Sequence, residues 1–168
     1  DQGLDADWAD ARELVKTDNT YREGRVDWDT TERQIQDLVN SPDRKRITVT
    51  QGFIGSSPEG LTTTLGREGS DYTGAILAYG SNAESLTIWK DVPGVLNADP
   101  KWFDNTVKLE RISYKEAIEL SYYGASIIHP KTIKPLENKK IPLYAKSFLN
   151  PKEDGTVIQT LEDLDTLV

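Results

Sequence analysis

Residues 62–75 read TTTLGREGSDYTGA, and this stretch joins a tight glycine turn to the start of an apolar run. Gly66 and Gly69 lack a Cβ atom, so they adopt positive φ readily and let backbone N–H groups approach a ligand closely. Ser70 is a favourable N-cap residue, and the apolar residues after it recur at helical spacing. A bend of N–H donors that leads into a helix N-terminus is typical of an anion site.

The charged side chains of this stretch suit a phosphate or carboxylate ligand. Arg67 can hold such a group through two parallel hydrogen bonds, and Asp71 can orient a cation or a lysine near a transferred phosphoryl group. An ordinary glycine turn before a serine-capped helix accounts for the same residues equally well, because short motifs have a high false-positive rate. The flanking sequence has to distinguish these two interpretations.

Composition excludes several classes of protein. The 168 residues carry a net charge of −8 with a pI near 4.7, which opposes binding to nucleic acid or anionic lipid. There is no cysteine and only one histidine, His129, so thiolate catalysis, zinc–sulfur sites and a histidine metal cluster are excluded, and no metal site is expected. No apolar run approaches the roughly 20 residues of a membrane span. We expect a cytoplasmic protein and, since methionine is absent even at position 1, a fragment.

The order of periodic segments predicts an α/β fold with a largely parallel sheet flanked by helices. Strands are expected at residues 5–10, 46–51, 85–89 and 142–145, and helices at 11–15, 30–40, 70–82, 114–123 and from Pro130. Residues 17–31 and 52–69 are expected to be loops. Ligands bind at the carboxyl ends of parallel strands, so the loops after residues 51 and 89 should converge on one crevice.

Five motifs in collinear order resemble the later part of the aspartate kinase domain of the amino-acid kinase family. They are QGFIG (51–55), TTTLGREGSDYT (62–73), WKDVPGVLNADP (89–100), YYGASIIHP (122–130) and KSFLNPKEDGTVI (146–158). The resemblance implies a partial amino-acid kinase domain over residues 1–158, the C-terminal nucleotide-binding part of that fold. Residues 159–168 would be a linker towards regulatory domains.

The resemblance also implies a reaction, in which the γ-phosphate of ATP, with magnesium, is transferred to the β-carboxylate of L-aspartate in lysine, threonine and methionine biosynthesis. Phe53, Arg67 and Ser70 would bind aspartate, and Asp71 would be the catalytic aspartate that orients lysines around the phosphoryl group. The nucleotide would contact Gly66, Gly69, Lys90, Asp91, Gly94, Asp99, Lys101 and Ser126. The parent protein is expected to be a homo-oligomer.

The chain departs from the family pattern at several positions. Glu68 stands where glycine is common, and Ser126 stands where a nucleotide-binding lysine is usual. The Lys-Phe-Gly-Gly-Thr-Ser segment, which supplies a catalytic lysine in the family, is not found within these 168 residues. Because phosphoryl transfer depends on positioning and electrostatic stabilisation, we expect the chain alone to be inactive. A noncatalytic module that serves assembly or regulation is the alternative.

Structural interpretations are favoured for the remaining aromatic and histidine residues. His129 is expected to be a hydrogen-bonded structural residue, since no partner for a catalytic base is evident. Trp89 is expected to pack in the core rather than border the adenine. Asp99 and Pro100 form either a simple turn or a ribose contact, and both interpretations stay open.

Overall fold

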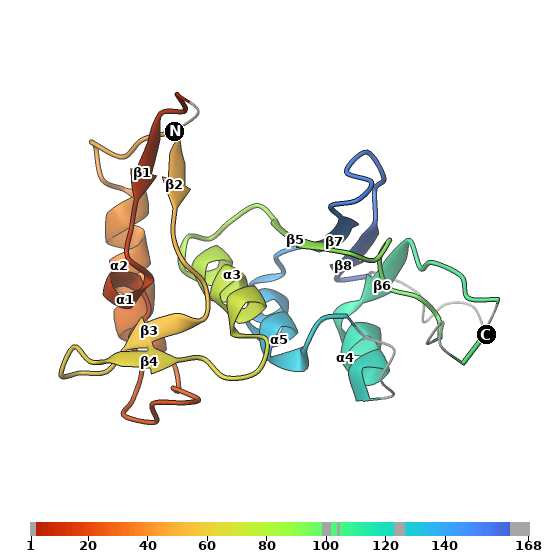
Figure 1. Cartoon of the computed structure of the whole chain (residues 1–168), viewed down its shortest axis with the longest axis horizontal. Coiled ribbons are helices and arrows are strands. Elements are labelled where there is room, and N and C mark those ends of the chain that lie inside the picture. Colours follow the sequence, from red (N-terminus) through yellow and green to blue (C-terminus); the bar gives the residue numbers. More distant parts are fainter. Residues whose placement is uncertain (1–2, 99–101, 104, 123–126, 162–168) are drawn as a thin grey trace. The chain divides into compact units, whose positions relative to one another are not determined.

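A computed structural model of the protein describes residues 3–98, 102–103, 105–122 and 127–161 (Figure 1). The chain divides into two compact units, Asp1–Ser81 and Asn82–Val168. The first contains β1 (Ala6–Trp8), α1 (Ala11–Leu14), α2 (Trp28–Val39), β2 (Ile47–Val49), β3 (Ile54–Ser56), β4 (Thr62–Thr64) and α3 (Gly69–Gly80). The second contains β5 (Leu86–Lys90), β6 (Arg111–Ser113), α4 (Tyr114–Tyr122), α5 (Pro130–Lys139), β7 (Leu143–Ser147) and β8 (Thr156–Gln159).

The core of the first unit lies between its helices. Buried side chains of α1, α2 and α3 pack together with Val15, the C-cap of α1, and with Leu65, which follows β4. The cluster consists of Leu14, Val15, Ile35, Leu65, Tyr72 and Ile76. Trp28, in the first turn of α2, packs edge-on against Tyr72 and Tyr79 of α3, with ring centroids 6.4 and 4.9 Å away. Gly80 lets α2 approach α3, because a Cβ there would lie 2.5 Å from Cδ1 of Ile35.

Helix α2 begins earlier than the sequence predicts. A start at Thr30 or Thr31 was expected, but the N-cap is Asp27, whose Oδ1 accepts the backbone N–H of Thr30 at 3.2 Å. The Thr30 hydroxyl also donates to Asp27, at 2.7 Å. An aspartate outcompetes a threonine as a cap when both lie within the first turn.

Two pairs of short strands flank this core. β1 and β2 are parallel, and α1 and α2 lie in the connection between them. β3 and β4 form an antiparallel hairpin inside residues 52–69. The expectation that residues 52–69 form a plain loop was therefore wrong, because strands of three residues are too short to have a recognisable alternation.

The second unit is built on a four-stranded sheet in the order β5–β7–β8–β6. β5 pairs in parallel with β7 and β6 pairs in parallel with β8, whereas β7 and β8 are antiparallel. Alternate residues of β7 and β8 are buried, among them Leu143, Ala145 and Ile158. The predicted α/β fold with a largely parallel sheet is confirmed, although β6 and β8 were not anticipated.

Local predictions in this unit had mixed outcomes. The predicted Ser113–Glu116 capping box is confirmed, since Glu116 N–H donates to Ser113 Oγ at 3.1 Å and Ser113 N–H donates to Glu116 Oε2 at 2.7 Å. Trp89 was expected in the core and is 48% exposed, because it alternates on β5 with the buried Ile88. Lys146 of β7 lies over its ring, 5.8 Å from the centroid.

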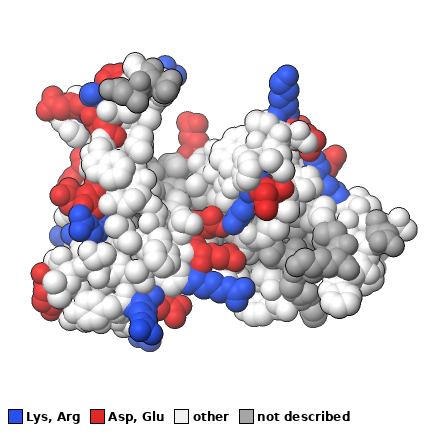
Figure 2. All heavy atoms as spheres, viewed as in Figure 1, with Lys and Arg blue, Asp and Glu red and all other residues white. Residues whose placement is uncertain are grey.

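Surface charge is consistent with the acidic composition. Figure 2 shows acidic side chains beside scattered basic ones, without a continuous basic surface on the visible face of the described residues. Among the described helices, none is both long and apolar enough to span a bilayer.

Candidate functional site

The loop before α3 has a conformation that only part of its sequence predicts. Gly66 has a φ of +75°, as a tight glycine turn requires. Glu68 is the N-cap of α3 in the left-handed region, with φ 53° and ψ 32°, and its side chain makes no capping hydrogen bond. The predicted N-cap at Ser70 is wrong, since the N–H of Tyr72 already donates to the carbonyl of Glu68 at 3.1 Å. Ser70 therefore lies in the first turn, with an exposed side chain.

The QGFIG turn packs directly on this helix start. Phe53 has a φ of 77°, and its N–H donates to the hydroxyl of Thr73 at 2.9 Å while its carbonyl accepts the N–H of Leu65 at 2.9 Å. The Phe53 ring fills the space that a side chain at Gly69 would need, since a Cβ there would lie 2.6 Å from Cδ2 of the ring. Gly52 is similarly close to Ser70, with a built Cβ 3.0 Å from the Cβ of Ser70.

The predicted aspartate-binding residues thus come from two segments that meet at the N-terminus of α3. Phe53 is 43% exposed, Arg67 and Ser70 are exposed, and Asp71 is half-buried in the first turn. An exposed guanidinium beside a helix N-terminus favours a carboxylate or phosphate ligand. The surface formed by Phe53, Arg67, Ser70 and Asp71 is called the α3 site below.

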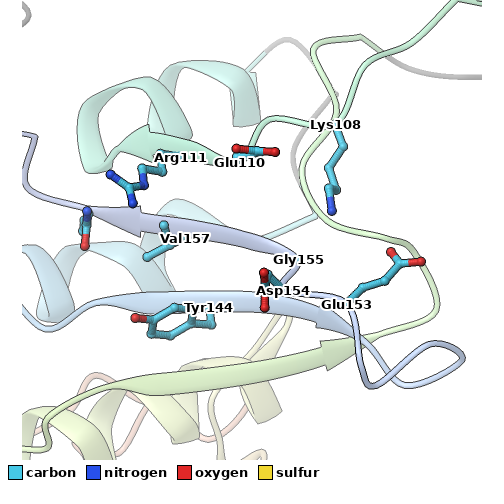
Figure 3. Close-up of a pocket in the computed structure, with 9 residues that line it drawn as sticks. Lys108, Glu110, Arg111, Tyr144, Glu153, Asp154, Gly155 and Val157 are labelled. Carbon is cyan, nitrogen blue, oxygen red and sulfur yellow. The ribbon is translucent and has the colours of Figure 1, made fainter.

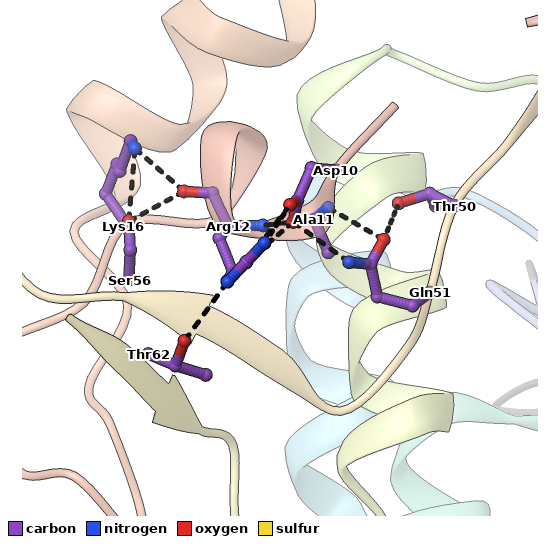
Figure 4. Close-up of polar contacts among 8 residues, drawn as sticks. All are labelled: Asp10, Ala11, Arg12, Lys16, Thr50, Gln51, Ser56 and Thr62. Atoms are coloured by element: carbon purple, nitrogen blue, oxygen red, sulfur yellow. Dashed lines mark hydrogen bonds and ion pairs between the residues drawn. The ribbon is translucent and has the colours of Figure 1, made fainter. Parts of the chain in front are cut away.

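A polar network that the sequence did not predict holds the QGFIG turn (Figure 4). The side-chain amide of Gln51 donates to Asp10 Oδ1 at 2.9 Å, and its oxygen accepts the N–H of Ala11 at 3.0 Å. Asp10 caps α1 and binds Arg12, with Oδ2 2.5 Å from the guanidinium. Arg12 extends to the hydroxyl of Thr62 on β4, at 3.5 Å. The network joins the turn that carries Phe53 to the start of α1.

Hydrogen bonds and charges in this network favour the ionised form of the Asp10 side chain. The pKa of Asp10 is lowered to about 2, chiefly by the side-chain hydrogen bond from Arg12 and then by the backbone N–H of Arg12. The pKa of Arg12 is raised, first by its hydrogen bond to Asp10. An aspartate followed two residues later by arginine, at the start of a helical segment, was the sequence signal for this pair.

In the second unit, three of the predicted nucleotide-binding residues lie within the part of the chain that the structure describes. They are Lys90, Asp91 and Gly94, at and after the carboxyl end of β5. Lys90 ends the strand and its carbonyl accepts the N–H of Phe148 at 2.9 Å, and Asp91 follows. Gly94 has a φ of +144°, and a Cβ there would lie 2.5 Å from the hydroxyl of Thr156 on β8. That hydroxyl accepts the N–H of Val95 at 2.9 Å, so β8 fixes this loop.

Three predicted residues, Asp99, Lys101 and Ser126, lie outside the described residues, and so does the alternative between turn and ribose contact at Asp99 and Pro100. Gly66 and Gly69 belong to the first unit and Lys90, Asp91 and Gly94 to the second. The predicted convergence of their loops therefore stays a prediction. His129 is the N-cap of α5, where Nδ1 accepts the N–H of Lys131 at 3.2 Å, which confirms a hydrogen-bonded structural histidine.

A cavity of about 420 Å³ lies on the second unit (Figure 3). Its lining residues are Lys108, Glu110, Arg111, Tyr144, Glu153, Asp154, Gly155, Val157 and Gln159. Three acidic side chains stand against two basic ones, a balance that does not favour a polyphosphate. None of these residues was predicted to bind a ligand.

Sequence comparison decides the family. Residues 1–147 match the amino acid kinase family over most of the chain. This chain belongs to the amino acid kinase family. The predicted likeness to aspartokinases within that family is also confirmed.

Several relatives within the amino acid kinase family are aspartokinases. Lysine-sensitive aspartokinase 3 of Escherichia coli is 36% identical, over 94% of this chain and 35% of its own length. The bifunctional aspartokinase/homoserine dehydrogenase 1 of Arabidopsis thaliana is 38% identical, over 97% of this chain and 18% of its own length. The chain thus spans about a third or less of these two relatives.

Solved structures of aspartokinases share the fold. E. coli aspartokinase III in complex with aspartate and ADP has a TM-score of 0.89 and 33% identity, covering 96% of this chain and 36% of that one. The aspartate kinase of Clostridium acetobutylicum has a TM-score of 0.78 and 36% identity, covering 94% of this chain and 34% of that one. The C-terminal nucleotide-binding part of the amino-acid kinase fold was the sequence expectation, and the α/β architecture agrees with it.

Proposed function

We propose that this chain carries the aspartate-binding part of an aspartokinase, an enzyme that transfers the γ-phosphate of ATP to the β-carboxylate of L-aspartate. One observation carries the proposal. The QGFIG turn packs on the first turn of α3, so that Phe53 lies against the helix start that contains Ser70 and Asp71 and directly follows Arg67 and Glu68 in the chain. E. coli aspartokinase III, which shares this fold, was solved in complex with aspartate and ADP.

In this proposal Arg67 grips a carboxylate of aspartate through two hydrogen bonds. The N–H groups at the start of α3 and the hydroxyl of Ser70 add donors on the same side of the substrate, and the helix N-terminus contributes a positive potential of roughly half a charge. Phe53 closes the site with an apolar surface and excludes water from the carboxylate. A small amino acid with a second carboxylate is the substrate that best suits these groups.

Phosphoryl transfer depends mainly on positioning and charge stabilisation. Asp71 would orient lysines around the transferred group, while Lys90, Asp91 and Gly94, with Asp99, Lys101 and Ser126, would serve the nucleotide. Among the described residues no group of three or more metal-binding side chains occurs. Magnesium would be held largely by the phosphates of ATP, as is usual for this ion.

The chain spans a minor part of its relatives, so activity is proposed for the whole protein. The lysine that precedes the aligned region in the family pattern is needed for the transfer, and the chain by itself should not turn over. We infer that the whole protein is a cytoplasmic homo-oligomer of amino-acid biosynthesis, and that residues 159–168 lead towards a regulatory domain.

The test joins this chain to the upstream segment of E. coli aspartokinase 3 and measures ADP release that depends on aspartate. Asp71→Asn should abolish turnover and leave the fold intact. Asp29→Asn, which changes the first-turn aspartate of α2, is the matched control and should keep it. Equal activity of the two variants would remove Asp71 from the active site.

A noncatalytic module for assembly or regulation is the second candidate. Glu68 favours it, since this carboxylate stands in the loop where a substrate anion would bind, and its Oε2 is buried without a hydrogen-bond partner among the described residues. Direct binding measurements with aspartate and with ATP on the same joined protein separate the two functions. A joined protein that folds and binds neither aspartate nor ATP would support the second.

A further inference from the structure

Thr73 of α3 is buried and joins the two segments that form the α3 site. It is 2% exposed, and its hydroxyl donates to the carbonyl of Gly69, one turn earlier in the same helix, at 2.8 Å. The same hydroxyl accepts the backbone N–H of Phe53 at 2.9 Å. Because the bond to Gly69 fixes the direction of the hydroxyl proton, a lone pair of the oxygen stays available to Phe53. One side chain therefore links the QGFIG turn to the start of the helix.

The backbone of Phe53 depends on such links. Its φ of 77° lies in the left-handed region, which is unfavourable for a residue with a Cβ atom. Two hydrogen bonds within the described part of the chain hold it there, one from its N–H to Thr73 and one to its carbonyl from the N–H of Leu65, at 2.9 Å. An unfavourable backbone conformation persists only where the surrounding contacts maintain it. Loss of the Thr73 hydroxyl would remove one of these two restraints.

The backbone conformation of Phe53 determines where its ring lies. The ring packs on Gly69, where a built Cβ would lie 2.6 Å from Cδ2 and 3.3 Å from Cε2 of the ring. Phe53 is 43% exposed, so it covers the helix start and borders the solvent at the same time. If φ returned to an ordinary negative value, the Cα–Cβ bond would change direction and the ring would leave Gly69. The buried hydroxyl of Thr73 thus acts on the surface of the α3 site through Phe53.

We propose that Thr73 is a positioning residue, whose hydroxyl holds Phe53 over the start of α3 and thereby sets the affinity of the α3 site for aspartate. Removal of the hydroxyl affects Phe53 more than the helix, because the carbonyl of Gly69 is also the α-helical acceptor of the Thr73 N–H. The N–H of Phe53 would lose its partner. The inference rests on the proposed function only in naming aspartate as the ligand.

Hydrogen exchange tests the contact without any ligand, in this chain joined to the upstream segment of E. coli aspartokinase 3. Thr73→Val keeps the shape of the side chain and removes the hydroxyl, so peptides that contain Phe53 should exchange at least about fivefold faster than in wild type. Thr31→Val is the matched control. Thr31 of α2 is 1% exposed and its hydroxyl accepts the N–H of Lys16 at 2.9 Å, so this variant loses a comparable bond elsewhere and should leave exchange at Phe53 unchanged.

Steady-state kinetics of the same joined protein test the consequence for the substrate. Thr73→Val should raise the KM for aspartate roughly 5- to 30-fold, because a backbone donor beside the site is left without its partner. The KM for ATP should change little, and kcat should fall by less than the KM for aspartate rises. Thr73→Ser, which restores the hydroxyl, and Thr31→Val should both keep the wild-type KM for aspartate.

Circular dichroism and urea unfolding establish that the variants fold, and Thr73→Ala replaces Thr73→Val if the latter does not. Equal exchange at Phe53 in Thr73→Val and wild type would overturn the proposal. Equal KM values for aspartate in Thr73→Val and Thr31→Val would also overturn it, in favour of a threonine that only stabilises the fold. A wild-type joined protein that folds and binds no aspartate would refute the proposed function instead, and faster exchange in Thr73→Val would still support the hold of Thr73 on Phe53.

Discussion

Glu68→Gly should stabilise the chain, because Glu68 holds a conformation that suits glycine. Its φ of 53° and ψ of 32° place it in the left-handed region at the N-cap of α3. An L-residue with a Cβ pays about 1–2 kcal/mol there, and glycine does not. Glycine costs about 0.5–1 kcal/mol in lost chain entropy on folding. The backbone terms alone leave a gain of about 0.5–1 kcal/mol.

Removal of the Glu68 carboxylate changes the free energy of unfolding in two opposite ways. Its Oε2 is buried without a partner among the described residues, and relief of such a group contributes about 1–3 kcal/mol. A negative charge near a helix N-terminus contributes about 0.3–1 kcal/mol in the opposite direction. Since the residue as a whole is half-buried, we take the low end of the first range and expect a net stabilisation of about 1 kcal/mol.

Urea unfolding followed by circular dichroism measures the effect, and a melting shift of about 2–4 °C should accompany it. Glu68→Ala is the matched control, because it removes the carboxylate and keeps the Cβ. The glycine variant should exceed the alanine variant by about 0.5–1 kcal/mol in free energy of unfolding, which is the backbone contribution alone. Equal stability of the two variants would refute the left-handed conformation as the source of strain.

Three further predictions concern other parts of the chain. Gly155→Ala should destabilise by about 2–4 kcal/mol in urea unfolding, because Gly155 has a φ of +73° and a Cβ there would overlap the carbonyl oxygen of Ala145; a near-neutral effect would contradict that packing. Asp10 has its pKa lowered from 3.8 to about 2, chiefly by Arg12, so its contribution to stability is complete above the ordinary pKa and is lost as the pH falls towards 2. Asp10→Asn should therefore lose less stability than wild type in acid titrations between about pH 4 and about pH 2, and identical profiles would exclude the pair. Burial raises the pKa of Tyr114 to about 12, so stability should fall as the pH rises from 10 to about 12, and Tyr114→Phe should flatten this loss in alkaline unfolding titrations.

The sequence predicted best where a physical signal was local. The Ser113–Glu116 capping box and Pro130 at the start of α5 are short-range features, and both are present. The strands β6 and β8 have three and four residues, too few for a period to be recognised. The left-handed backbone of Glu68 was not predicted, although the glycine that is common at this position in the family pattern was a signal for it.

The candidate site was likewise predicted where motifs marked it and missed where contacts are distant in the sequence. The residues of the α3 site were named from motifs, and the structure brings Phe53 against the helix start. The contact that holds this turn was missed, because Gln51 and Asp10 are 41 residues apart and no spacing along the chain links them, although the local pair of Asp10 and Arg12 had a sequence signal. Tertiary contacts of this separation are determined by packing, which spacing along the chain does not report.

The central claim is that the α3 site binds aspartate, and the Michaelis constant for aspartate tests it most directly. The assay uses this chain joined to the upstream segment of aspartokinase 3, with Arg67→Ala compared with wild type. Loss of a charge-assisted hydrogen bond of about 1.5–3 kcal/mol corresponds to a rise of roughly 10- to 150-fold in KM for aspartate. The KM for ATP should change little. An unchanged KM for aspartate in a folded, active Arg67→Ala variant would contradict the account.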